Sequence, residues 1–116
     1  MTLLEATLYI LVVTAADKPF LCERSAPTVI VCTHGHNATY GSGEAITIDN
    51  KIKVEKKKDG EVAFSNGVTG RFDSFGWVRF SNGVSVRRTG EKEFASSTKL
   101  SCTPQGDKVV RCVRGG

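Results

Sequence analysis

The chain has 116 residues, a formal net charge of +4 and a hydrophobic fraction of 40%. That length accommodates one domain, and the apolar content is too high for a disordered chain. Twelve glycines with only three prolines exclude collagen and proline-rich linkers.

The first sixteen residues are apolar and carry one charge, at Glu5. The run Leu8–Val13 is followed by Ala15 and Ala16, an order typical of the apolar region and small-residue cleavage site of a secretory signal, although the usual basic residues are missing. We therefore predict a signal-like segment at 1–16 and a single all-β domain at 17–116. Cleavage after Ala16 would raise the net charge to +5. The alternative is a buried strand, and the run is too short to span a membrane.

The four cysteines form two pairs with nine residues inside each pair: Cys22 with Cys32, and Cys102 with Cys112. An even number at matched spacing predicts two disulfides and an exported protein, either periplasmic or extracellular. Local pairing within each hairpin is the simplest arrangement, and crossed pairing stays open. A zinc site is disfavoured because neither pair has the short spacing of zinc ligands.

From Ala45 onward apolar residues alternate with polar ones, which predicts strands with one buried face. The dipeptides Asp59-Gly60, Asn66-Gly67 and Asn82-Gly83 predict type I′ hairpin turns, and the segment 73–76 predicts another turn. No helical period follows residue 16. The predicted fold is all-β: a small antiparallel meander of about eight short strands, forming an open barrel or sandwich with two disulfides.

One short segment occurs twice, as Phe64–Val68 and again as Phe80–Val84. We interpret the repeat as a favourable hairpin tip used twice, and the alternative is a duplicated two-strand unit. One repeat of five residues does not establish a repeat architecture, which needs at least three units.

The segment Phe75–Phe80, FGWVRF, resembles the RNP1 motif of the RNA recognition motif family, and Leu8–Ile10 resembles the start of its RNP2 strand. The resemblance implies binding of single-stranded nucleic acid by stacking bases on aromatic rings. The leading basic residue and glycine of the motif are replaced by Asp73 and Ser74, and the helix that the family has between the two motifs is missing from the pattern. A half-buried strand with Trp77 and Arg79 on one face is the other interpretation.

Exposed aromatic and basic side chains are the candidate binding residues, because tryptophan and arginine are enriched at binding hot spots. They are Trp77, Arg79, Arg87 and Arg88, with a basic hairpin tip at Lys56, Lys57 and Lys58. Basic clusters attract anionic surfaces, although lysines at strand edges also prevent aggregation. We predict a non-catalytic exported domain that binds a protein or an anionic envelope polymer. The alternatives are the nucleic-acid-binding protein and a secreted toxin or host-directed effector.

Cys32, His34 and His36 stand at alternate positions, where a strand would place three metal ligands on one face. A disulfide at Cys32 leaves two histidines, which make a weak site, so no metal is predicted. The sequence contains no phosphate-binding loop, dinucleotide fingerprint or nucleophile elbow. We therefore predict neither a cofactor nor an enzyme.

Overall fold

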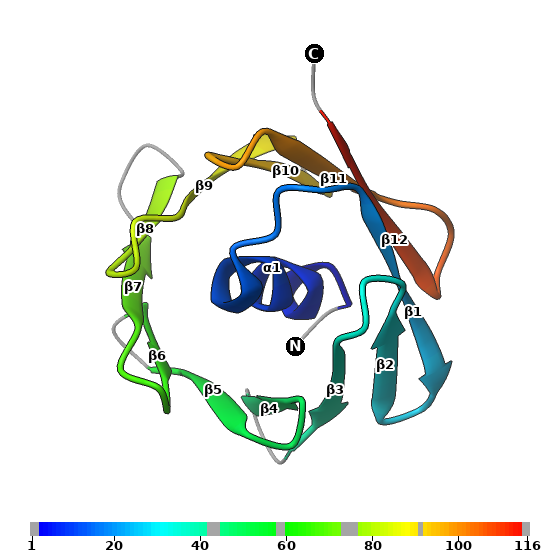
Figure 1. Ribbon diagram of the computed structural model, residues 1–116, viewed down its shortest axis with the longest axis horizontal. Helices are drawn as coiled ribbons and strands as arrows, with labels where there is room; N and C mark the ends of the chain where they lie inside the picture. Colours follow the sequence, from blue (N-terminus) through cyan, green and yellow to red (C-terminus); the bar gives the residue numbers. More distant parts are fainter. Residues whose placement is uncertain (1–2, 42–44, 58–59, 73–76, 91, 115–116) are drawn as a thin grey trace.

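The computed structural model describes residues 3–41, 45–57, 60–72, 77–90 and 92–114. In this part of the chain, the helix α1 (Leu3–Thr14) precedes twelve strands, which pair antiparallel in chain order, and β12 returns to pair with β1. The sheet is therefore a closed barrel (Figure 1). The strands are β1 (Phe20–Ala26), β2 (Val29–Cys32), β3 (Asn37–Tyr40), β4 (Ala45–Ile48), β5 (Ile52–Lys56), β6 (Glu61–Phe64), β7 (Thr69–Phe72), β8 (Trp77–Phe80), β9 (Ser85–Gly90), β10 (Glu93–Ser96), β11 (Leu100–Pro104) and β12 (Val109–Arg114).

The antiparallel meander with two disulfides is confirmed, but the prediction of about eight strands in an open barrel or sandwich is wrong. Short strands with little alternation explain the low count: β3 and β10 each have four residues and one fully buried side chain, Ala38 and Phe94. The barrel closes because the sheet curves until β12 lies beside β1. The pairing of these two strands removes the two sheet edges that would otherwise be exposed.

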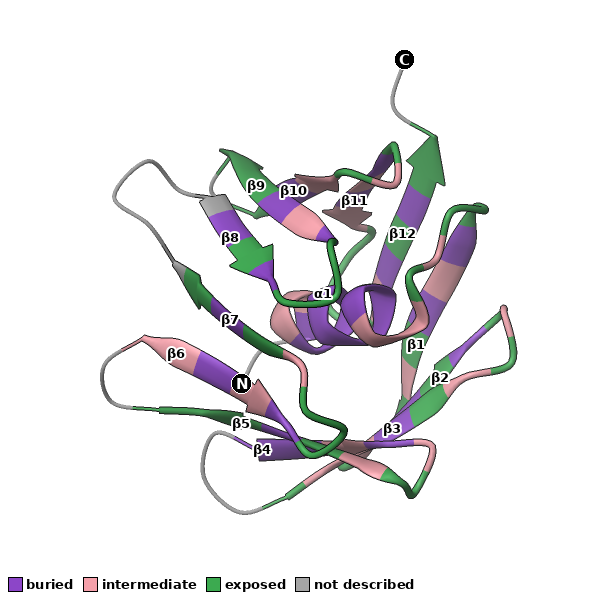
Figure 2. Cartoon of the chain, turned by 60° about the vertical axis from the view of Figure 1, so that its left-hand side comes forward, coloured by how far each residue is buried: buried purple, intermediate pink, exposed green. Residues whose placement is uncertain are grey.

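The helix α1 lies inside the ring of strands (Figures 1 and 2). Ile10, Leu11 and Val12 are fully buried, and the Tyr9 ring meets the edge of Phe64 on β6 at 6.0 Å between centroids. Apart from Glu5 in its first turn, the helix carries no charged residue, as suits a helix that the inner face of the barrel surrounds. A buried strand at this position is therefore wrong, and Leu8–Ile10 do not form an RNP2-like strand.

The inner face of the barrel is built from alternate residues of each strand, as Figure 2 shows by its bands of buried and exposed segments. One inward row runs from Val62 on β6 through Gly70 on β7 to Phe80 on β8. The Phe80 ring lies over Gly70, where any side chain would collide with it. Glycine is thus required at this position to seat an aromatic ring in the lumen.

The two disulfides pair locally, Cys22 with Cys32 and Cys102 with Cys112. Each joins residues directly opposite one another, on β1 and β2 and on β11 and β12. All four cysteines are buried, at most 4% exposed. The disulfides therefore clamp the two hairpins on either side of the β1–β12 seam that closes the barrel, and they restrict the unfolded chain.

Turns occur at Asn66-Gly67 and Asn82-Gly83 as predicted, but the predicted type I′ geometry is wrong. Among these residues only the glycines have positive φ, 96° and 93°, so each tip is a type I turn followed by a bulge glycine. A type I′ turn occurs instead at Asp49 and Asn50, whose φ values are 54° and 56°.

Five hairpin tips recur at intervals of sixteen residues within the described chain. The first tip residue donates its backbone N–H to the carbonyl of the residue twelve positions earlier, at 2.8 Å in all five cases. Its side-chain oxygen accepts the N–H of that same residue at 2.9–3.0 Å. These tip residues are Thr33, Asp49, Ser65, Ser81 and Ser97.

The segment that occurs twice, Phe64–Val68 and Phe80–Val84, therefore belongs to a repeated two-strand unit, and its interpretation as a tip merely used twice is wrong. The other copies are not recognisable by sequence similarity, because the residue at the tip differs: threonine, aspartate and serine can each supply the acceptor oxygen. The left-handed position is also variable: Lys99, with φ 72°, stands where three other tips have Gly35, Gly67 and Gly83.

Replacing Ser65 with alanine removes the oxygen that accepts the Lys53 N–H. We expect Ser65→Ala to lower the free energy of unfolding by about 0.5–1.5 kcal/mol, the net contribution of one hydrogen bond. Ser65→Thr keeps the hydroxyl that Thr33 uses at the matching tip and should retain most of the stability. Urea denaturation of both variants measures the difference, and equal stability of the two would contradict this role.

Candidate functional site

Three arginines lie on neighbouring strands of the outer wall: Arg71 on β7, Arg79 on β8 and Arg87 on β9. All three are exposed, whereas Val78 and Phe80 on either side of Arg79 are buried in the lumen. Arg71 stands directly opposite Arg79 in the register. We call these three residues the outer arginine surface.

The outer arginine surface concentrates positive charge. Residues directly opposite in antiparallel strands have Cβ atoms about 5 Å apart, and like charges at that spacing destabilise the sheet. Glu61 on β6 partly offsets this repulsion through an ion pair with Arg71 at 3.7 Å. A shallow hollow of about 420 Å³ lies beside the two facing arginines, with Thr69 and Ser81 at its border. The arrangement presents hydroxyl and guanidinium donors together on an accessible wall.

The predicted binding residues do not form one site. Arg79 and Arg87 belong to the outer arginine surface, whereas Arg88 and Lys56 line a cavity beside α1. Lys57 is exposed directly after β5. Trp77 is the register partner of Arg87, but its side chain is outside the part of the structure that is described, as is the whole of Lys58.

The cavity beside α1 has a volume of about 130 Å³ and opens where the helix begins. Apolar side chains form its interior and charged side chains its rim; we call it the mouth cavity. The interior residues are Leu4 and Leu8 of α1 with Val78, Val86 and Phe94 of the wall, and the rim residues are Glu5, Lys56, Arg88 and Glu93. Glu5 and Lys56 form an ion pair at 3.6 Å.

Sequence reasoning missed Arg71 and Glu5. The register of β7 and β8, which pair antiparallel, brings Arg71 opposite Arg79. The turn predicted at 73–76 lies outside the described residues. Glu5 stands where a secretory signal would have a basic residue, and its place in the sequence indicates no binding role. Its place at the mouth cavity depends on a helix inside the barrel, which no local pattern predicts.

Phe80, the last residue of the aromatic segment Phe75–Phe80, has no exposed ring on which a base could stack. This side chain is only 5% exposed and meets Phe64 edge to face at 5.8 Å. Its ring therefore belongs to the core and cannot stack on a nucleic-acid base. Phe75 and Gly76 lie outside the described residues.

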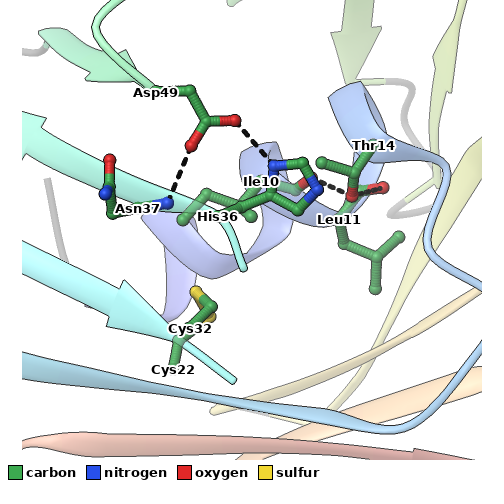
Figure 3. Close-up of polar contacts among 8 residues, drawn as sticks. All are labelled: Ile10, Leu11, Thr14, Cys22, Cys32, His36, Asn37 and Asp49. Carbon is green, nitrogen blue, oxygen red and sulfur yellow. Dashed lines mark hydrogen bonds and ion pairs between the residues drawn. A yellow bond between two sulfur atoms is a disulfide. The ribbon is translucent and has the colours of Figure 1, made fainter. Parts of the chain in front are cut away.

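The histidines lie near the Cys22–Cys32 disulfide. His34 stacks on Phe20 with 4.1 Å between ring centroids. Figure 3 shows Asp49 between His36, whose Nδ1 is 2.6 Å from Oδ2, and the Asn37 N–H, which donates to Oδ1 at 2.9 Å. Across the described ranges, no group of three or more His, Cys, Asp or Glu residues is arranged to hold a metal ion.

The environment of the histidines shifts two pKa values. Burial lowers the pKa of His34, the neighbouring His36 lowers it further, and Asp49 opposes the shift. Both ring nitrogens of His34 are buried without a hydrogen-bond partner among the described residues. Burial alone would raise the pKa of Asp49, but the hydrogen bonds from His36 and the Asn37 amide, with the histidine charges, lower it.

A lowered histidine pKa makes stability depend on pH. The pKa of His34 is about 6.5 in the unfolded chain and lower in the folded chain. Protonation below pH 6.5 therefore favours the unfolded chain, so the free energy of unfolding is highest above pH 6.5 and falls as the pH decreases below it. We expect His34→Phe, which preserves stacking on Phe20, to show a smaller fall in Tm between pH 7.5 and 5.5. Thermal unfolding at both pH values measures it. An unchanged pH dependence would show that His34 titrates normally in the folded protein.

Among the described residues, no helix is both long and apolar enough to cross a membrane. Comparison with known proteins leaves this fold and these sites unassigned to any family: no family description, no curated protein and no solved structure matches the chain.

Proposed function

We propose that the protein is an exported, non-catalytic binding domain whose outer arginine surface engages an anionic polymer. The observation that carries the proposal is the placement of Arg71 directly opposite Arg79. Two facing guanidinium groups repel one another, and a bound anion would replace that repulsion with attraction. The surface would then contribute more to binding than to the stability of the free domain.

A polymer suits this surface better than a single small anion. Arg87 is offset from Arg79 by two positions in the register, since Arg79 faces Ser85, and such diagonal neighbours lie roughly 7–8 Å apart. The three arginines therefore extend over neighbouring strands instead of enclosing one point. Guanidinium groups bind sulfate, phosphate and carboxylate in a bidentate manner, which favours arginine over lysine in this role.

Export is supported by the two disulfides, because such bonds form and persist in oxidising compartments. The other two predicted functions have less support. Burial of Phe80 removes one stacking ring from a nucleic-acid site, and no contact among the described residues favours a toxin or effector.

Heparin, a soluble sulfated polymer, is the probe for the outer arginine surface. We expect the double variant Arg79→Gln, Arg87→Gln to elute from heparin at lower NaCl concentration than the unaltered protein. Its binding should also depend less steeply on salt, because fewer counterions are released when fewer charges engage the polymer. Elution position and the slope of log K against log salt measure the two effects.

The matched control is Arg111, which is exposed on β12 and faces Leu21 and Thr103 in the register. A pair of variants that each lose one charge, Arg111→Gln and Arg79→Gln, separates local binding from net charge. Arg79→Gln should have the larger effect. Equal effects of the two would reduce the interaction to overall charge and overturn the proposal.

The fate of residues 1–16 is a separate prediction. The sequence alone predicts cleavage after Ala16, but eight residues of α1 are buried, and this burial leads us to propose the opposite outcome. Because cleavage would leave the lumen unfilled, we expect the protein isolated from its source cells to retain α1. Its intact mass should include residues 1–16 and be four hydrogens below the reduced value, two for each disulfide. A chain beginning at Asp17 would contradict retention.

A further inference from the structure

The mouth cavity has no part in the proposed function, and its shape and chemistry define a second binding site. Its volume of about 130 Å³ is close to that of an engineered apolar cavity of about 150 Å³ that takes up benzene. The cavity therefore accommodates a small apolar body, but not the acyl chain of a membrane lipid.

The interior is suited to an apolar ligand. Val78 and Val86 are 1% exposed and Phe94 is 3% exposed, and Leu8 of α1 faces them across the cavity. Each wall residue is fixed in a paired strand, so the space is held open by the barrel and by the helix together. A ligand entering it would bury its apolar surface against atoms that are already withdrawn from water.

The rim carries two charges of each sign: Lys56 and Arg88 are basic, and Glu5 and Glu93 are acidic. The Glu5–Lys56 pair has a separation of 3.6 Å, and both side chains are about a third exposed. Ion pairs that are this accessible to solvent contribute little to stability. Breaking this ion pair to engage a ligand therefore costs little.

We propose that the mouth cavity binds a small zwitterion with an apolar tail, with the chemistry of an apolar α-amino acid. The carboxylate of the ligand would lie toward Arg88 and Lys56, the ammonium group toward Glu5 and Glu93, and the tail against Leu8 and Phe94. A ligand with only one charge can pair with the two rim residues of opposite sign, whereas a zwitterion can pair with all four. Charge complementarity thus selects a molecule that carries both signs on a short head.

Three six-carbon probes separate the head groups while keeping a linear tail: L-norleucine, hexanoate and hexylamine. Each is titrated into the full, isotope-labelled chain and followed by amide chemical shifts. We expect norleucine to bind at least fivefold more tightly than either singly charged probe. The largest shifts should occur at the cavity residues Val78, Val86 and Phe94.

Variants of the rim should discriminate between the two charges. Arg88→Gln should weaken norleucine and hexanoate at least threefold and spare hexylamine, whereas Glu93→Gln should weaken norleucine and hexylamine and spare hexanoate. Val86→Phe, which fills the cavity, should abolish binding of all three probes. Arg111→Gln, on the outer wall, serves as the control that changes charge without touching the cavity, and thermal unfolding verifies that every variant is folded.

The proposal is overturned if hexanoate or hexylamine binds as tightly as norleucine, if norleucine binding is insensitive to both rim variants, or if the folded protein shows no saturable shifts. None of these results would alter retention on heparin, because the outer arginine surface and the mouth cavity lie on opposite faces of the barrel wall. Failure of either proposal is therefore distinguishable from failure of the other.

Discussion

Filling the lumen is the constraint on which this structure depends. Barrels of about eight strands are filled by their own inward side chains, but a closed sheet of twelve strands encloses a wider space. The helix α1 occupies that space and carries no charged residue apart from Glu5. A polar contact lies at each end of the helix: Asn82 donates a hydrogen bond to the Val12 carbonyl at 2.9 Å, and Glu5 pairs with Lys56 at 3.6 Å. Shape and apolar burial hold the helix, and the end contacts set its position.

Local patterns were sufficient to predict an antiparallel β-meander from Ala45 onward, the presence of two disulfides and the turns at Asn66-Gly67 and Asn82-Gly83, because alternation and turn residues are short-range properties. They were insufficient for α1. The run Leu8–Val13 has no polar side, so the same residues fit a signal, a buried strand or a helix within a barrel. The strands that surround the run decide between these structures, and the pairing of β1 with β12 leaves no mark in a local pattern.

The candidate sites show a related limit. The alternation of strand residues correctly places Arg79 away from Val78 and Phe80, but it does not distinguish the outer wall from the open end of the inner wall. Arg88 follows Val86 on the inward side and emerges at the mouth cavity. A polar residue at the open end of an inward-facing row is as accessible to solvent as a residue on the outer wall. The sequence pattern therefore placed Arg88 and Arg87 in the same predicted binding site. Closing the barrel separates them.

The sixteen-residue unit also determines how this architecture can change in size. Five tips share the same pair of hydrogen bonds. Because all strands pair antiparallel in chain order and β12 closes on β1, the circumference can grow or shrink only by a whole hairpin. Losing one unit would narrow the lumen until α1 no longer fitted, and gaining one would leave a void around the helix, which is destabilising. The length of the sheet and the girth of its central helix are thus coupled, and neither can evolve without the other.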